Sequence, residues 1–176
     1  MTKINIPLDQ WAKIPHDIWD SHWFLLSAGD YSKDEFNTMT ISWGSFGTIW
    51  NRPFAMVVVR PQRYTFQFME KYDDFSLCAF PTKFQPTLNL LGTISGRDND
   101  KIKESGLSVQ PSKIIKAPVF NEAILQIECK KIYWDDLNPD HFIAKYIPRQ
   151  YPMKDYHRMY FGEIVAIETD SSFFNS

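Results

Sequence analysis

The segment from residue 37 to residue 44 reads Asn37-Thr38-Met39-Thr40-Ile41-Ser42-Trp43-Gly44. Its β-branched and aromatic residues favour a β-strand, and successive side chains on a strand point to opposite faces. The hydroxyl-bearing residues therefore share one face: Thr38, Thr40 and Ser42. We predict a strand from Asn37 to Ser45 whose hydroxyl face fits the polar edge of a heteroaromatic ring. A solvent-facing strand, with threonine present for its β-propensity, is the alternative.

Five further segments have the same strand-like composition. They are Trp23 to Ala28, Phe54 to Arg60, Phe75 to Phe80, Ala123 to Trp134 and Met159 to Glu168. Short helices are predicted between them at Tyr64 to Tyr72, Lys83 to Leu91 and Asn99 to Ser105, with Asp98 as the N-cap of the last and Gly106 as its stop. Many strands with a few short helices predict a mainly β fold, a closed or split barrel rather than a βαβ sheet.

The chain of 176 residues has the length of one domain, and no linker or repeat divides it, so we expect a single domain over residues 1–176. Aromatic residues make up 16% of the sequence. Large rings need stacking partners, which an aromatic ligand or a subunit interface would supply. A core that favours large side chains is the alternative.

The formal net charge of −2 gives no electrostatic reason for nucleic acid to bind. The sequence has no signal-like apolar run and no 18-residue apolar stretch, so we expect a cytoplasmic protein without membrane spans. Cys78 and Cys129 lie far apart in strand-like segments and match no metal spacing. We expect both to be buried, reduced thiols.

Several common sites are missing from the sequence. It contains no G-x-G-x-x-G or G-x-x-x-x-G-K-[ST] pattern, no H-E-x-x-H pattern and no G-x-S-x-G elbow. Its four histidines, His16, His22, His141 and His157, form no close cluster with cysteines. Any nucleotide cofactor must therefore be held without a Rossmann site or a P-loop, and no metal site is predicted.

A possible phosphate site lies in Arg60-Pro61-Gln62-Arg63-Tyr64-Thr65, which ends one predicted strand and opens a predicted helix. A phosphate there would meet free N–H groups of the helix start, a threonine hydroxyl and one or two guanidinium groups. Arginine suits this role because its planar fork matches phosphate oxygens. Surface arginines without a ligand are the alternative.

The stretch Ser95-Gly96-Arg97-Asp98-Asn99-Asp100-Lys101 holds a glycine that permits a tight turn and a lysine in the first turn of a short helix. Lys101 is positioned to supply a second positive charge to a phosphate. The acidic residues of the stretch are explained as helix caps.

Taken in order, the stretches N-T-M-T-I-S-W-G, V-V-V-R-P-Q-R-Y-T and L-L-G-T-I-S-G-R-D-N-D-K resemble the flavoredoxin branch of the flavin reductase-like, FMN-binding split-barrel family. The resemblance continues through E-A-I-L-Q-I-E-C-K-K-I-Y to the tail. It implies a six-stranded split barrel, a homodimer, and non-covalent flavin mononucleotide (FMN) in a groove to which both subunits contribute.

The resemblance also implies which residues bind the cofactor. The isoalloxazine and ribityl chain would be contacted by Asn37, Thr38, Thr40, Ser42 and Trp43. The phosphate would be bound by Arg60, Arg63, Tyr64, Thr65 and Lys101, with Ser95 and Arg97 in the adjoining turn. His141 corresponds to a position near the flavin and Phe174 to a tail aromatic that covers the ring; a structural histidine and a disordered terminus are the alternatives.

The function implied is that of an FMN-dependent oxidoreductase, which takes electrons from NADH or NADPH and passes them to flavin, iron or another small acceptor. The cofactor carries this chemistry, so no catalytic side chain is predicted. The first alternative is a non-enzymatic FMN electron carrier that docks on redox partner proteins. The second is a barrel that binds some other ligand.

Overall fold

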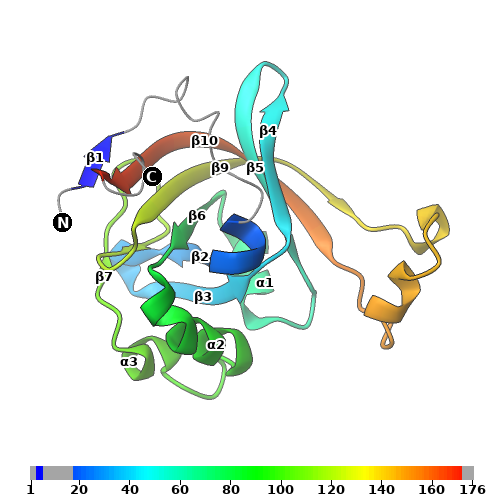
Figure 1. The fold of residues 1–176 in the computed structure, drawn as a ribbon, viewed down its shortest axis with the longest axis horizontal. Coiled ribbons are helices and arrows are strands. Elements are labelled where there is room, and N and C mark those ends of the chain that lie inside the picture. Colours follow the sequence, from blue (N-terminus) through cyan, green and yellow to red (C-terminus); the bar gives the residue numbers. More distant parts are fainter. Residues whose placement is uncertain (1–2, 6–17, 172–176) are drawn as a thin grey trace.

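The computed structural model describes residues 3–5 and 18–171. The described part of the chain is mainly β (Figure 1). The large sheet contains β1 (Lys3–Asn5), β2 (Phe24–Asp30), β3 (Glu35–Ile41), β4 (Gly44–Ile49), β5 (Arg52–Val59), β6 (Asp74–Ala79), β9 (Leu125–Asp136) and β10 (Arg158–Asp170). A small second sheet pairs β7 (Val109–Gln110) with β8 (Val119–Phe120).

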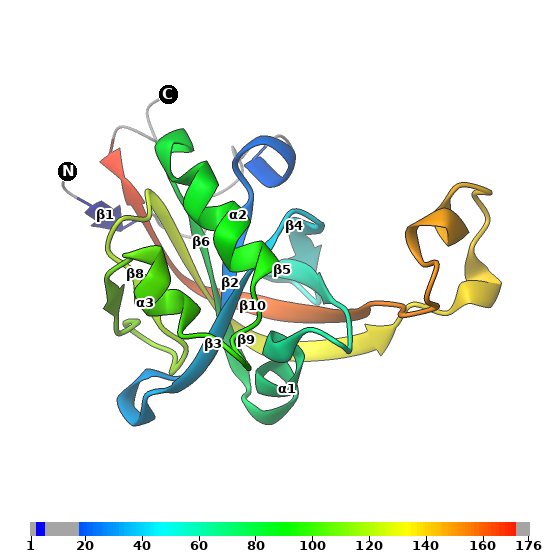
Figure 2. The same cartoon turned by 90° about the horizontal axis from the view of Figure 1, so that it is seen from below.

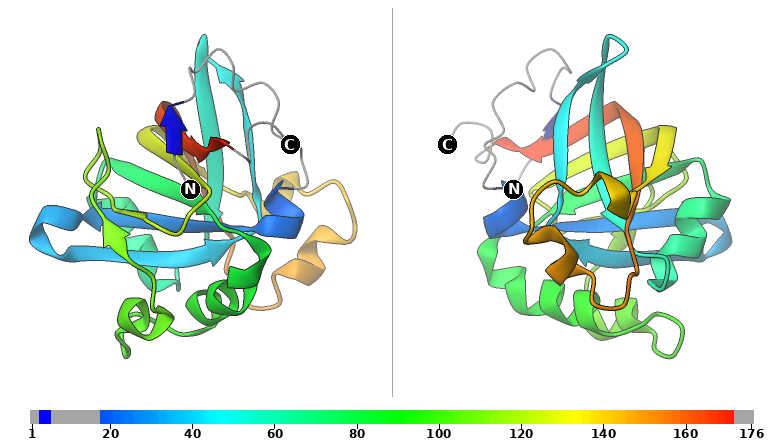
Figure 3. Two further views of the ribbon diagram at one scale, coloured as in Figure 1. Left: turned by 60° about the vertical axis from the view of Figure 1, so that its left-hand side comes forward. Right: turned by 90° about the vertical axis from the view of Figure 1, so that its right-hand side faces the viewer.

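The large sheet is antiparallel, in the order β3-β2-β6-β9-β10-β5-β4, with β1 paired to β10. Strands β3 and β4 end this path on opposite sides, yet Ser42 and Trp43 alone connect them. Three residue steps reach roughly 11 Å at most, so the sheet must curl until its two edges meet (Figure 3). The result is a barrel that is split between β3 and β4, and we call this opening the seam.

All six predicted strands are present, but the strand predicted from Asn37 to Ser45 is two strands. Strand β3 stops at Ile41 and β4 starts at Gly44. A Cβ atom at Gly44 would lie 2.4 Å from a Trp19 ring atom and 2.6 Å from the Met56 carbonyl oxygen. The chain therefore changes direction where it passes too close to its neighbours for a side chain, and β4 begins a hairpin with β5.

The helices confirm the predicted positions with small shifts at their ends. They are α1 (Tyr64–Lys71), α2 (Gln85–Thr93) and α3 (Lys101–Ser105), with short turns η2 (Ile18–His22), η3 (Tyr31–Lys33) and η4 (Thr82–Phe84). The predicted N-cap Asp98 is wrong. Asp100 caps α3 by accepting the Lys103 N–H at 3.2 Å, whereas the Asp98 N–H bonds the Ser95 carbonyl in the preceding turn.

Two apolar clusters fill the fold. One lies inside the barrel and includes Phe24, Leu26, Val57, Phe75 and Ile127. The other lies outside the sheet, under α2, and includes Leu25, Phe80, Leu88, Leu91 and Phe120. Neighbouring residues of β2 face different clusters, so this strand is buried on both sides. Cys129 is buried in the first cluster and Cys78 in the second, and they form no disulfide with each other, as predicted.

Residues 137–157 form an arm that projects from the barrel between β9 and β10 (Figures 1 and 2). It contains the turns η5 (Pro139–His141) and η6 (Ile147–Gln150). Ile143 is 97% exposed and Met153 82% exposed near its end. Its last residues return to the barrel, where Tyr151 and His157 are buried beside the seam. Within the described residues, no helix is long and apolar enough to cross a membrane.

Candidate functional site

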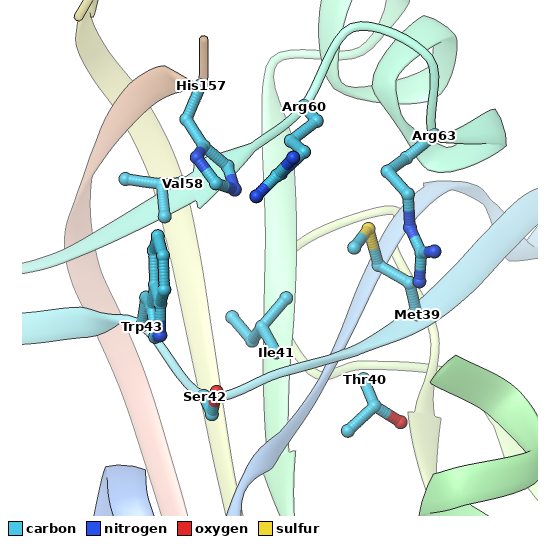
Figure 4. A pocket seen from close by; sticks show the side chains of 9 residues that line it. All are labelled: Met39, Thr40, Ile41, Ser42, Trp43, Val58, Arg60, Arg63 and His157. Carbon is cyan, nitrogen blue, oxygen red and sulfur yellow. The ribbon is translucent and has the colours of Figure 1, made fainter. Parts of the chain in front are cut away.

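Two adjoining pockets open beside the seam. The seam pocket, about 320 Å³, is lined by Met39, Thr40, Ile41, Ser42, Trp43, Val58, Arg60, Arg63 and His157 (Figure 4). The basic pocket, about 170 Å³, is lined by Asn37, Met39, Gln62, Arg63, Tyr64, Thr65, Thr93, Ile94, Ser95, Arg97 and Lys101. Because Met39 and Arg63 belong to both, the two pockets form one elongated site along β3.

Two cations of the basic pocket donate hydrogen bonds to backbone carbonyls at the end of α2. Arg63 Nη2 donates to the Gly92 carbonyl at 2.5 Å, and Lys101 Nζ donates to the Leu91 carbonyl at 3.2 Å. These carbonyls end α2, whose dipole offsets part of the charge. No carboxylate of the described residues forms an ion pair with either side chain. The pocket is therefore electrostatically suited to an anion.

Burial makes the positive charges of Lys101 and Arg63 energetically unfavourable. Lys101 is only 4% exposed, and burial, with the nearby charge of Arg63, lowers its pKa to about 8. Burial and the charge of Arg60 also lower the pKa of Arg63. An anion placed between Arg63 and Lys101 would stabilise both charged side chains and raise both pKa values.

A polar chain orients Thr65 at the start of α1. Asn37 Nδ2 donates to Thr65 Oγ1 at 2.7 Å. Because Thr65 Oγ1 accepts this bond, its own proton is free to donate to a ligand. A Cβ atom at Gly96 would lie 2.3 Å from Asn37 Oδ1, so this turn requires glycine to pass so close. Arg97 lies over the Tyr64 ring at 5.4 Å and closes the outer side.

The seam pocket has an apolar floor and a polar wall. Met39, Ile41 and Val58 supply aliphatic surface, and the His157 ring lies 5.2 Å from the Trp43 ring. Figure 4 shows the Arg60 and His157 side chains next to each other above this surface. Burial, together with the charge of Arg60, lowers the pKa of His157 to about 4, so this imidazole is neutral at pH 7.

Arg60 is anchored differently from Arg63. Its Nη1 pairs with Asp155 Oδ2 at 2.6 Å and its Nη2 donates to the Gln150 carbonyl at 2.9 Å. The Tyr151 ring lies 5.1 Å from the same guanidinium. The hydrogen bond from Arg60 holds the pKa of Asp155 below its usual value. Arg60 therefore fastens the base of the arm to the rim of the seam pocket.

Comparison with known proteins decides the family. A model of the flavin reductase like domain matches residues 21–175. This chain belongs to the flavin reductase-like family.

Relatives of this flavin reductase-like chain support the fold. Flavoredoxin of Desulfovibrio vulgaris (Miyazaki F) is 21% identical, with 86% of this chain and 70% of that chain covered and a TM-score of 0.66. An FMN-binding domain of flavin reductases-like enzyme from Shewanella baltica OS155 is 16% identical, with 99% and 80% covered and a TM-score of 0.74. The domain match confirms the predicted family, and these structural similarities confirm the split-barrel fold.

A curated relative from Pyrococcus abyssi, itself uncharacterised, is 26% identical over 136 residues. The matched region covers 76% of this chain and 66% of the length of that relative.

Most residues predicted to bind the flavin line the two pockets. The seam pocket contains Thr40, Ser42, Trp43 and Arg60, the basic pocket contains Asn37, Tyr64, Thr65, Ser95, Arg97 and Lys101, and Arg63 belongs to both. Arg60, predicted at the phosphate with Arg63, lines the seam pocket together with Arg63 and His157.

The hydroxyl face predicted on β3 is turned largely toward the protein. Thr38 is fully buried, and its Oγ1 donates to the Leu26 carbonyl at 2.9 Å. Thr40 Oγ1 donates to the Leu88 carbonyl at 2.5 Å. α2 covers this face of the strand, so Ser42, beyond the end of β3, is the exposed hydroxyl of the three.

His141 lies on the arm, exposed, and lines neither pocket. Phe174 lies outside the described residues. The histidine that lines the seam pocket is His157, which the sequence analysis did not select. Its signal in the sequence is weak: His157 lies two residues after Asp155 and two residues before the predicted strand that begins at Met159.

Proposed function

We propose that this flavin reductase-like protein binds FMN non-covalently along β3, with the phosphate in the basic pocket and the ring in the seam pocket. The observation that carries the proposal is that the buried Lys101 and the half-buried Arg63 both lack a carboxylate partner among the described residues. At neutral pH a phosphate monoester has nearly two negative charges and three strong acceptor oxygens. Such a group matches the two cations and the free Thr65 proton.

The dimensions and lining of the site support the ring assignment. Four residue steps along β3, from Asn37 to Ile41, span about 13 Å, and Ser42 and Trp43 continue the lining beyond the end of the strand. This length suits an extended ring, ribityl chain and phosphate. The aliphatic floor of Met39, Ile41 and Val58 suits a flat aromatic ring. None of the described residues that line the seam pocket is acidic, so its polar groups favour a ring edge that bears carbonyl oxygens.

The proposed activity is electron transfer from NADH or NADPH to flavin or another small acceptor. Bound FMN supplies the redox chemistry by accepting a hydride or two electrons. The residues of the chain bind and orient it. Arg63, Lys101 and Thr65 would hold the phosphate, while Trp43 and His157 limit the access of water to the seam pocket.

An absorbance spectrum tests the proposal. The purified protein, or apoprotein given FMN, should show a flavin spectrum, and acid should release FMN rather than FAD. Anaerobic addition of NADH and then NADPH should bleach the bound flavin with one or both donors. Bound flavin that neither donor reduces would indicate an electron carrier instead. A protein that takes up no flavin from added FMN would refute the cofactor assignment.

We also propose that the protein is a homodimer in which a second copy covers the arm and a neighbouring aromatic surface. Trp50, at the tip of the β4–β5 hairpin, is 61% exposed and its ring lies 6.0 Å from the ring of Tyr133. Ile143 and Met153 on the arm are also exposed, and exposed large apolar side chains are candidates for an interface with another chain. A second copy of the same surface satisfies the symmetry of a closed dimer.

Sedimentation at micromolar concentration tests the dimer. The wild-type protein should sediment at twice 20.7 kDa, and Ile143→Glu should shift it toward the monomer. Lys154→Glu, an exposed charge change on the same arm, is the control. A wild-type monomer with FMN fully bound would rule out the dimer without affecting the flavin assignment.

A further inference from the structure

Tyr151 is held firmly at the base of the arm, beside the seam pocket. It is 5% exposed. Its ring stacks on Phe142 with centroids 5.9 Å apart, contacts Tyr156 at 5.2 Å and lies under the Arg60 guanidinium. These contacts fix the direction of the phenol, and its Oη lies 2.8 Å from Nδ1 of His157.

The position of the shared proton follows from the donors and acceptors present. Burial raises the pKa of Tyr151, so the phenol keeps its proton. Within the described part of the chain, His157 Nδ1 is the hydrogen-bond partner found for Oη. Since a buried hydroxyl needs an acceptor, the Tyr151 O–H donates to Nδ1. A neutral imidazole whose Nδ1 accepts must carry its proton on Nε2.

We propose that Tyr151 is a positioning residue that holds His157 as the neutral Nε2–H tautomer, so that the seam pocket presents an N–H donor to a carbonyl or carboxylate oxygen. The proposal rests on the proposed function in that the oxygen belongs to the flavin or to the second substrate of the same site. Tyr151 does not line the pocket and acts only through His157.

The surroundings of His157 favour this state. Arg60 is its nearest cation in the pocket (Figure 4) and disfavours an imidazolium. Asp155 acts in the opposite direction, but its Oδ2 is engaged by Arg60 and Gln62. The Trp43 ring lies 5.2 Å from the imidazole and is tilted against it by 48°. With the Nε2–H tautomer, the ionic and imidazole groups that line the described pocket are all donors: Arg60, Arg63 and His157. An oxygen acceptor complements them, and an N–H group does not.

The tautomer is tested directly in the apoprotein by long-range ¹H–¹⁵N correlation of the histidine side chains at pH 7. Wild-type His157 should show an unprotonated Nδ1 and a protonated Nε2. Tyr151→Phe keeps the ring contacts and removes only the hydroxyl, and it should give a mixture with substantial Nδ1–H. Tyr156→Phe, the same change on the adjoining ring, is the control and should leave the pattern unchanged. A wild-type Nδ1–H signal, or identical patterns in wild type and Tyr151→Phe, would overturn the proposal.

Binding measurements then identify the source of the oxygen. If a ring carbonyl of FMN is the acceptor, Tyr151→Phe should weaken both FMN and riboflavin by about threefold to tenfold. If the second substrate supplies it, flavin affinity should stay within about twofold while FMN-loaded protein binds benzaldehyde or benzoate more weakly by a similar factor. If Tyr151→Phe changes the affinity for none of these ligands, the proposed role of His157 in binding them is overturned. The tautomer readout needs no flavin, so failure of flavin binding alone would refute the proposed function and not the action of Tyr151 on His157.

Discussion

The basic pocket and the seam pocket share Arg63, but the other cations that line them have different hydrogen-bond partners. In the seam pocket, Arg60 is paired with a carboxylate, Asp155, at 2.6 Å. In the basic pocket, Arg63 and Lys101 donate to backbone carbonyls and have no acidic partner among the described residues. A cation that already has its counter-charge fastens one segment to another. A cation at least partly removed from water and without a counter-charge is instead suited to an anionic ligand.

The largest expected effect concerns the unpaired cations. Arg63→Ala or Lys101→Ala should each weaken FMN about tenfold or more, because each removes a charge-assisted hydrogen bond worth roughly 1.5 to 3 kcal/mol. Riboflavin, which lacks the phosphate, should change little. Titration of apoprotein with both ligands by fluorescence quenching measures the two affinities.

Arg60→Ala is the matched control, because it removes an arginine three positions away that is already paired. The ratio of FMN to riboflavin affinity should stay near the wild-type value in this variant. Arg63→Lys should recover part of the loss, since it keeps the charge without the planar fork. Equal losses of FMN and riboflavin in Arg63→Ala would refute the phosphate assignment.

The second-largest expected effect is the pH dependence of FMN affinity. The pKa of Lys101 is about 8 without an anion, and a bound phosphate would raise it by direct attraction. Above pH 8 Lys101 of the free protein is deprotonated, so FMN binding then requires the uptake of one proton by this lysine. FMN affinity should therefore fall as pH rises past 8, by at most about tenfold per pH unit.

Lys101→Arg provides the comparison for this titration, because arginine stays protonated across the range. The decline above pH 8 should flatten in the variant. A wild-type FMN affinity that is constant between pH 7 and pH 9.5 would show that Lys101 does not couple to the phosphate.

A smaller effect is expected at Thr65. Thr65→Val keeps the shape and removes the hydroxyl, so FMN should bind about fivefold more weakly. Thr65→Ser restores the hydroxyl and should return most of the affinity. Isothermal titration with FMN measures both variants, and equal behaviour of valine and serine would show that the hydroxyl does not reach the phosphate.

The smallest effect on ligand discrimination is expected at Asp155. Asp155→Asn removes the carboxylate that pairs with Arg60, yet the ratio of FMN to riboflavin affinity should not change. The pairing lowers the pKa of Asp155, so its contribution to stability is present above the ordinary aspartate pKa and is lost as pH falls below it. Melting curves from pH 7 to pH 3 should therefore show that, at the acid end, the melting temperature of the wild type falls more steeply than that of Asp155→Asn. Parallel curves would show that the pair does not stabilise the fold.

Local patterns explain how much of this molecule was predictable. Strand composition located six strands of the sheet, and the helix start at Tyr64 placed Arg63 and Thr65 together because they are neighbours in the chain. The break between Ile41 and Gly44 was missed, since it depends on contact with Trp19 and the Met56 carbonyl. Thr38 was assigned to the ligand because alternation gives the face of a residue but not what covers that face.

The sequence by itself determined the mainly β class, the resemblance to the flavin reductase-like family and the grouping of basic residues that suits a phosphate. Only the tertiary structure decided which basic residue keeps a partner and which histidine enters the pocket. Arg60 meets Asp155, 95 residues away in the chain, and His157 reaches the seam because the arm returns there. Arg60 and Arg63 have the same side-chain chemistry, and their partners differ because, within the described residues, the folded chain brings a carboxylate to Arg60 alone.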